Sequence, residues 1–165
     1  MNLSSRAKEI IDKIIYITIA TSSEDGQPWN SPVYSAYDGD YNFYWDSPKD
    51  SIHSQRIKEN LKVALAIFNS TAVGSDVDAV YIKAKAYEVN DKKELIKSLT
   101  LYVAKMIKTK FANKSNAEKF IKQYIDFQGS SKLRLYKAIP EKFWKPAMAK
   151  IFGINGLLGI IKEDP

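Results

Sequence analysis

The stretch that decides the fold runs from residue 41 to residue 69 and reads YNFYWDSPKDSIHSQRIKENLKVALAIFN. Its first residues have the aromatic, β-favouring composition of a strand, which Pro48 should end. Asp50 and Ser51 can cap a short helix. The apolar run from Val63 to Phe68 has the length of a buried strand. The stretch therefore predicts a strand, a polar turn, a helix that begins near Ser51, and a second strand.

The predicted start of this helix has the properties of an anion-binding site. Backbone N–H groups without intrahelical partners converge there with the positive end of the helix dipole. Further hydrogen-bond donors nearby are Ser47, Ser51, His53, Ser54, Gln55 and Arg56. We therefore expect this part of the chain to favour an anion such as a phosphate monoester. A solvated strand–helix connection without a ligand is the alternative.

Composition narrows the class of protein. The chain has 165 residues, of which 45% are hydrophobic and 27% charged, as expected for one soluble globular domain spanning residues 1–165. It has no cysteine, and His53 is its one histidine, which excludes disulfides, thiolate metal sites and histidine-rich metal sites. The first 15 residues are amphipathic and carry acidic side chains, unlike a signal peptide. No run reaches the roughly 18 apolar residues of a membrane span. We expect a cytoplasmic protein with no membrane partner.

Charge is distributed unevenly along the chain. Residues 1–80 hold 7 Lys and Arg against 11 Asp and Glu, whereas residues 81–165 hold 18 against 8. A basic C-terminal half can attract nucleic acid, an anionic lipid surface or an anionic ligand. The aromatic residues cluster in the acidic half, whereas nucleic-acid platforms interleave aromatics with cations. This separation argues against nucleic acid and favours solvated helix faces.

Hydrophobic periodicity and turn residues place further elements before the central stretch: a helix from Ser4 or Ser5, and strands at residues 16–22 and 29–37. Asp25-Gly26 and Asp38-Gly39 tolerate positive φ, so each predicts a hairpin. Two consecutive hairpins predict an antiparallel meander, which is how a barrel starts.

The sequence of the second half of the chain predicts a strand, then helices, then a further strand. Residues 79–89 alternate apolar and polar side chains, as in a strand with one buried face. Residues 91–127 predict two helices with apolar stripes typical of a core. A last strand over Lys132–Ile139 should stop at Pro140. The apolar, glycine-broken tail at 141–165 favours packing on a partner subunit or on the barrel over a membrane surface.

Trp45-Asp46-Ser47-Pro48, followed by His53-Ser54-Gln55-Arg56-Ile57 and by Asn60 before an aliphatic strand, resembles the pyridoxamine 5'-phosphate oxidase-like family. Members of that family are split β-barrels that bind FMN at a homodimer interface. The resemblance implies an α+β fold, mainly β: an antiparallel six-stranded-type FMN-binding split barrel with peripheral helices. It covers about residues 14–90 and 130–145, which leaves residues 91–127 as a helical insert.

The resemblance implies cofactor-binding residues on three segments. Residues 25–33 are similar to the family's second strand, residues 44–46 to the end of its third strand, and residues 51–55 to its phosphate-binding segment. A cation that follows the phosphate segment, Arg56, adds to it. The cofactor-binding residues so implied are Asn30, Ser31, Pro32, Val33, Tyr44, Trp45, Asp46, Ser51, His53, Ser54, Gln55 and Arg56.

Departures from the family pattern argue against the vitamin B6 reaction itself. Ile52 and His53 stand where the oxidases place an arginine and a lysine, and Ser31 stands roughly where they place another arginine. Their late Arg-x-His motif is absent. The resemblance therefore implies an FMN-dependent oxidoreductase with another small-molecule substrate. No catalytic residue is identified, because the flavin itself carries the redox step.

Three alternatives remain open at this point. Deazaflavin could replace FMN as the cofactor. A flavin- or heme-binding carrier or sensor would need no turnover. A nucleic-acid-binding barrel would use the C-terminal lysines and surface aromatics.

Overall fold

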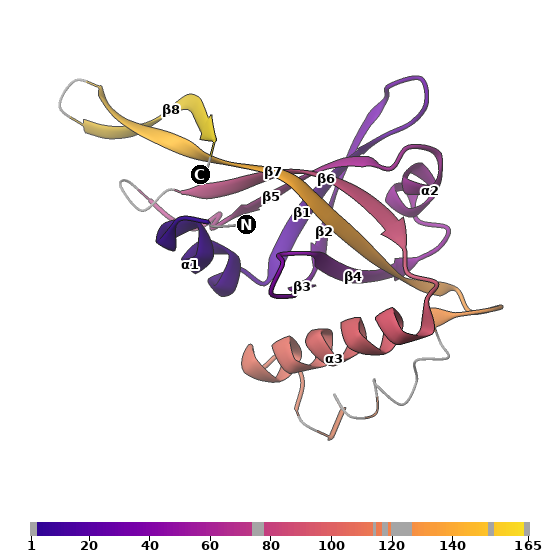
Figure 1. Cartoon of the computed structure of the whole chain (residues 1–165). Helices are drawn as coiled ribbons and strands as arrows, with labels where there is room; N and C mark the ends of the chain where they lie inside the picture. The colour runs from indigo at the N-terminus through magenta and orange to yellow at the C-terminus, as the bar shows by residue number, and fades with distance from the viewer. Residues whose placement is uncertain are drawn as a thin grey trace.

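The computed structural model describes residues 3–73, 78–113, 115–116, 119, 127–151 and 154–163, with side chains as far as Lys145. In these residues, one antiparallel sheet of eight strands curves into a half-barrel with three helices around it (Figure 1). The elements are α1 Ser5–Lys13, β1 Tyr16–Ser22, β2 Pro28–Tyr34, β3 Ala36–Tyr37, β4 Phe43–Pro48, α2 Ile52–Glu59, β5 Lys62–Phe68, β6 Ala79–Glu88, α3 Lys92–Lys108, β7 Leu133–Ile151 and β8 Ile154–Glu163. The predicted mainly-β, α+β class is confirmed.

The strand order explains how the sheet curls on itself. It runs β2-β1-β5-β6-β7-β4-β3, with β8 added to β7. The strand predicted over residues 29–37 is therefore two strands, β2 and β3, which lie at opposite ends of this order. Ser35 is the single residue between them. The two ends of the sheet are thus neighbours in the chain, which brings β2 and β4 close together.

Both predicted hairpins form. Ser22 pairs with Pro28 across the first turn, where Gly26 has a φ of 86°. Tyr37 pairs with Phe43 across the second turn, but its positive φ of 61° belongs to Tyr41 and not to Gly39. The Asp38 carboxylate accepts hydrogen bonds from the backbone N–H groups of residues 40 and 42, which holds this turn in place.

The barrel core follows from strand alternation. On β6, Val80, Ile82, Ala84 and Ala86 are at most 1% exposed, as the alternating pattern predicted. They pack with apolar side chains of β1 and β5 and with the stacked rings of Trp45 and Tyr136, 5.7 Å apart. This core fixes the strands on which the candidate site is built.

The prediction of where the last strand ends was wrong. β7 does not stop at Pro140 but continues to Ile151. Ala84 pairs with Pro140 and Lys83 with Lys142, so Glu141 is an extra residue at a bulge. Proline has no N–H to give to the ladder, and a bulge is one of the places where a strand tolerates it. The tail then turns back as β8, and Figure 1 shows this hairpin extending beyond the body of the sheet.

The helices largely agree with their sequence signals. Ser4 caps α1, which buries Ala7, Ile10 and Ile11 as predicted. α3 is the first of the two helices expected in the insert, and it lies beside β3 and β4. The apolar stripe of the second expected helix lies outside the described residues; it consists of Ala117, Phe120, Ile121, Tyr124 and Ile125. None of the described helices has the length and apolar character needed to span a bilayer.

Candidate cofactor site

The helix α2 begins as the sequence predicted. Ser51 is its N-cap, and its hydroxyl accepts a hydrogen bond from the backbone N–H of Ser54 at 3.4 Å. The first helical residue, Ile52, is 43% exposed, so the start of the helix reaches the surface and is not sealed beneath other elements. An anion bound at this end of the helix would meet the positive end of the helix dipole.

A buried cluster of one histidine and several serines joins α2 to two strands. His53 Nδ1 lies 3.1 Å from Ser31 Oγ on β2, and Nε2 lies 2.8 Å from Ser47 Oγ on β4. Nε2 also lies 3.3 Å from the cap hydroxyl of Ser51. Burial lowers the pKa of His53, so the imidazole is neutral at pH 7. A neutral ring has one donor and one acceptor, and hydroxyl groups can satisfy both.

A cavity of about 380 Å³ opens against this cluster. Its walls come from β2, β4, the start of α2, and α3 with the residues that follow it. The lining residues are Pro32, Val33, Tyr34, Asp46, Ser47, His53, Tyr102, Met106 and Phe111. Four of the residues predicted to bind a cofactor, Pro32, Val33, Asp46 and His53, thus meet at one cavity although they come from three separate segments.

The other predicted residues lie around this cavity in different roles. Ser31, Ser51 and Ser54 belong to the buried hydrogen-bond cluster, in which Ser51 Oγ donates to Ser54 Oγ at 2.8 Å. Asn30 is exposed on β2, and Gln55 is exposed on α2, where its amide donates to the carbonyl of Asp50. These positions place Asn30 and Gln55 at the rim of the site or outside it.

Tyr44, Trp45 and Arg56 are engaged within the protein. Tyr44 and Trp45 are 0% exposed, so their side chains belong to the core and not to the cavity wall. Arg56 Nη1 donates to the carbonyl of Gln27 at 2.6 Å, which braces the turn between β1 and β2 against α2. A cofactor could meet Tyr44 and Trp45 through backbone groups, whereas Arg56 can act on a ligand through its charge.

One wall of the cavity was missed by sequence reasoning. Tyr34 packs edge-on against Tyr102, with ring centroids 5.0 Å apart, and lies 4.7 Å from Phe111. The Tyr102 hydroxyl donates to the Asp46 carboxylate at 2.5 Å. Burial raises the pKa of Tyr102, and the negative charge of Asp46 raises it further, so the phenol stays protonated. The sequence did contain a sign of this wall: Tyr102 lies within an apolar helical stripe, and a buried tyrosine hydroxyl needs a polar partner.

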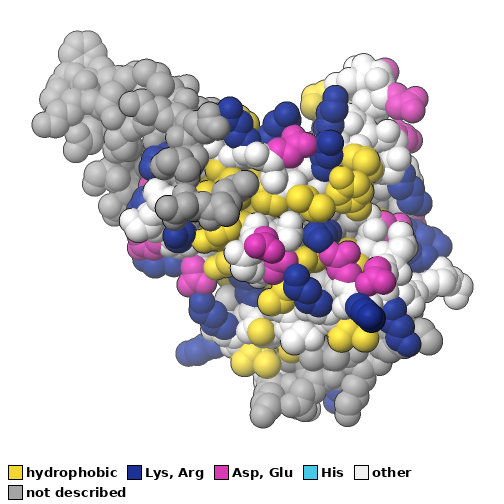
Figure 2. Space-filling model, in the orientation of Figure 1, with side chains coloured by type: hydrophobic (Ala, Val, Ile, Leu, Met, Phe, Trp, Pro, Cys, Tyr) yellow, Lys and Arg dark blue, Asp and Glu magenta, His cyan; other side chains and the backbone are white. Residues whose placement is uncertain are grey.

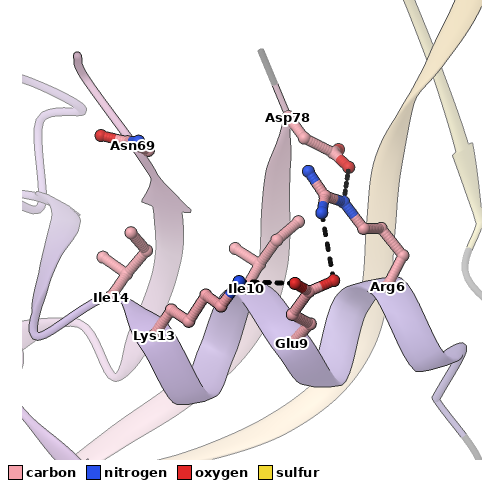
Figure 3. A pocket seen from close by; sticks show the side chains of 7 residues that line it. All are labelled: Arg6, Glu9, Ile10, Lys13, Ile14, Asn69 and Asp78. Atoms are coloured by element: carbon pink, nitrogen blue, oxygen red, sulfur yellow. Dashed lines mark hydrogen bonds and ion pairs between the residues drawn. The ribbon is translucent and has the colours of Figure 1, made fainter. Parts of the chain in front are cut away.

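Another cavity lies between α1 and the ends of β5 and β6. It measures about 450 Å³, and Figure 3 shows the side chains that line it. Arg6 donates to Asp78 at 2.8 Å and pairs with Glu9, which also accepts from Lys13 at 2.6 Å. Because these charges pair with one another, we do not assign a ligand to this cavity. Among the described residues, no group of three or more metal-ligating side chains occurs.

Comparison with known proteins identifies the class. A family model for pyridoxamine 5'-phosphate oxidase matches residues 3–155. The chain therefore belongs to the pyridoxamine 5'-phosphate oxidase family, and the resemblance seen in the sequence is confirmed. Among curated proteins, no sequence matches the chain.

Solved structures with the same fold include proteins of different kinds. HutZ, a heme storage protein from Vibrio cholerae, shares 16% identity over 95% of this chain and 97% of its own, with a TM-score of 0.62. A heme binding protein from Mycobacterium smegmatis shares 15% identity over 99% of this chain and 59% of its own, with a TM-score of 0.65. A Listeria innocua protein named as a pyridoxamine 5'-phosphate oxidase shares 15% identity over 90% of this chain and 96% of its own, with a TM-score of 0.56. At these identities, the likeness is one of fold.

Proposed function

We propose that the chain is an FMN-binding oxidoreductase. The observation that carries the proposal is that the cavity lies next to the start of α2, because His53 in the first turn of the helix forms part of the cavity wall. Ser47 and His53 line the cavity, and His53 Nε2 also lies 3.3 Å from the Ser51 hydroxyl that caps α2. A ligand with an anionic tail and a planar body could therefore reach both the N–H groups of the helix and the cavity.

The residues present fit such a ligand. The cavity volume of about 380 Å³ falls within the range of roughly 300–1,000 Å³ typical of small-molecule sites. Apolar and aromatic side chains, such as Val33, Met106 and Phe111, suit the faces of a ring system, while the Ser51 hydroxyl and the first α2 N–H groups suit a phosphate. FMN, when bound, would supply the hydride chemistry, and the chain would supply position and electrostatics.

We propose further that the protein is a homodimer, with the cofactor at the interface. The outer face of the sheet has a shallow depression of about 370 Å³ that includes small or aromatic side chains: Ala20, Ala64, Ala66, Tyr81 and Trp144. Figure 2 shows a band of hydrophobic side chains across the face it presents, between groups of lysine and arginine. Exposed apolar area of this kind favours a protein partner.

Light scattering should give a mass twice that of one chain, and a monomer at micromolar concentration would contradict the dimer.

Turnover separates an enzyme from a carrier. For an oxidoreductase, protein loaded with FMN should oxidise NADH or NADPH in the presence of an electron acceptor faster than free FMN does at the same concentration. A rate equal to that of free FMN with every acceptor tried would argue for a carrier or sensor. The same assay run with deazaflavin in place of FMN tests that cofactor.

A heme-binding function is the second candidate, because two proteins of the same fold are named for heme storage and heme binding. Heme iron in proteins is held by histidine, cysteine, methionine or tyrosine side chains. In this cavity, His53, Met106 and the tyrosines are the residues of those types, and both ring nitrogens of His53 already lie within hydrogen-bond distance of serines. Titration with hemin, followed by the Soret band, tests this alternative. Saturation at one heme per chain with loss in His53→Ala would favour it over FMN.

The cap of α2 should distinguish the phosphate from the ring. We expect Ser51→Ala to weaken FMN binding about tenfold, because it removes the cap, worth about 1 kcal/mol, that holds the first turn of α2 in position for the phosphate. Riboflavin, which lacks the phosphate, should lose less than threefold. The measurement is quenching of flavin fluorescence, with Gln55→Ala on the exposed side of the same helix as the control. Equal losses for FMN and riboflavin would place the phosphate elsewhere.

A further inference from the structure

A second cavity lies between α3 and the short strand β3, away from the proposed cofactor site. It measures about 340 Å³. Its apolar walls are Ala36, Leu101, Ala104 and the ring of Tyr37, and Lys105 lies among them. Neither the family resemblance nor the proposed FMN site uses any of these residues, so the cavity needs an explanation of its own.

Lys105 has an environment unlike that of an exposed lysine. Its ammonium donates to the backbone carbonyl of Ile14 at 3.2 Å and lies 5.6 Å from the ring centroid of Tyr37. The nearby carboxylate of Asp12 is occupied by others, since Lys108 Nζ approaches it at 2.6 Å and the Tyr37 hydroxyl donates to it at 3.1 Å. Lys105 thus has a neutral hydrogen-bond acceptor in place of an ion-pair partner.

Burial leaves the amine of Lys105 partly neutral near physiological pH. Burial lowers the pKa of Lys105 to about 8; Asp12 opposes this shift and Lys108 adds to it. Burial raises the pKa of Tyr37 to about 12, so its phenol stays protonated. On the β3 side, the Asp38 carboxylate pairs with Lys97 at 2.9 Å. The neutral amine keeps a lone pair, which is what a nucleophile requires.

We propose that Lys105 is a nucleophilic amine that captures a small aldehyde in this cavity as an imine. The nitrogen lone pair attacks the carbonyl carbon, a C–N bond forms, and the carbonyl oxygen takes the proton that nitrogen loses. The resulting carbinolamine loses water to give the C=N bond, with no oxidant or reductant involved. Leu101, Ala104 and the Tyr37 ring line the same space, so the aldehyde class that fits best has an apolar or aromatic body.

The test is reductive trapping on the full-length protein. Benzaldehyde at low concentration with cyanoborohydride converts each imine to a stable benzyl-lysine, and peptide mass mapping reports the labelled position. At pH 7.5, we expect Lys105 to be labelled at least tenfold faster than Lys13 or Lys83, which are exposed. The reason is that burial favours the neutral, nucleophilic form of the Lys105 amine, whereas water stabilises the ammonium form of an exposed amine. Between pH 7.5 and 9.5, the Lys105 rate should level off, because its pKa of about 8 leaves little ammonium form above that range.

Two variants separate the amine from its cavity. Lys105→Arg keeps a cationic donor for the Ile14 carbonyl but is not a nucleophile under these conditions, and it should lose the fast label. Leu101→Trp fills the cavity without changing Lys105 and should slow labelling at Lys105 at least fivefold. Lys93→Arg, exposed in the first turn of α3 and outside the cavity lining, should leave labelling unchanged. Uniform labelling of Lys105 and the exposed lysines in the wild-type protein, or an unchanged rate in Leu101→Trp, would overturn the proposal.

Discussion

Replacing Asp38 by alanine should lower the free energy of unfolding by about 3 kcal/mol, the largest stability effect expected of any polar residue in the second hairpin. The Asp38 side chain is 5% exposed and accepts hydrogen bonds from several donors. They are the backbone N–H groups of Asp40 at 3.1 Å and Asn42 at 2.9 Å, the Asn42 amide at 3.0 Å, the Tyr44 hydroxyl at 3.0 Å and Lys97 Nζ at 2.9 Å. Without the carboxylate, the buried Tyr44 hydroxyl loses its acceptor, and a buried unpaired polar group costs about 1–3 kcal/mol.

Acid should remove the same stabilisation. Burial by itself would raise the pKa of Asp38, but the hydrogen bonds from Asn42, Lys97 and Tyr44 outweigh it and lower the pKa to about 2. The folded pKa lies below the unfolded value of about 3.9, so this contribution is complete above pH 4 and is lost as the pH falls towards 2.

Urea denaturation at pH 7 and at pH 3 measures both effects. The gap between wild type and Asp38→Ala should shrink at the lower pH. Asp40→Ala is the matched control, because Asp40 is exposed in the same turn and should change stability by less than about 0.5 kcal/mol. An Asp38→Ala variant as stable as the Asp40→Ala control would show that the turn does not depend on this carboxylate.

Replacing His53 by alanine should weaken FMN binding about 100-fold, equivalent to about 2.8 kcal/mol. The imidazole contacts Ser31 of β2, Ser47 of β4 and the cap Ser51, and it forms part of the cavity wall. The truncation leaves hydroxyl groups without their partner and enlarges the cavity next to the phosphate position, two effects that add.

The pH dependence of binding provides a second readout for His53. Burial lowers the pKa of His53 in the folded protein below the ordinary value near 6.5. The folded state therefore favours the neutral ring. Stability that depends on the neutral ring is therefore lost as the pH falls through the folded pKa. We expect FMN affinity in the wild type to fall as the pH drops through the lowered pKa of His53, which lies below 6.5, and to fall less steeply in His53→Ala. Parallel pH profiles for the two proteins, or an affinity unchanged by the substitution, would exclude this role.

Much of the fold near α2 could be predicted because its signals are local. A serine cap, a proline at the end of a strand and an Asp-Gly turn each act over a few residues, so the chain carries them in order. The same holds for β6, whose alternation records one buried face. For these elements, the residues that cause the structure are the same residues that made it predictable from the sequence.

What could not be predicted depends on residues far apart in the chain. The contact of Tyr102 with Asp46 joins residues 56 positions apart, so a helix stripe that reads only as core also forms a wall of the cavity. Pro140 ends a strand by local rules, yet the bulge at Glu141 lets β7 continue beside β6. In the second turn, the residue with positive φ is Tyr41 and not Gly39. Tyr41 lies between the two residues whose backbone N–H groups donate to the Asp38 carboxylate.

The most direct test of the FMN site is the visible absorption spectrum of the protein after incubation with FMN and removal of free cofactor by gel filtration. The site predicts a flavin spectrum that elutes with the protein at one FMN per chain and is strongly reduced in His53→Ala. A protein fraction with no flavin absorption, combined with salt-sensitive binding of a single-stranded oligonucleotide, would contradict the FMN site and favour a nucleic-acid-binding barrel.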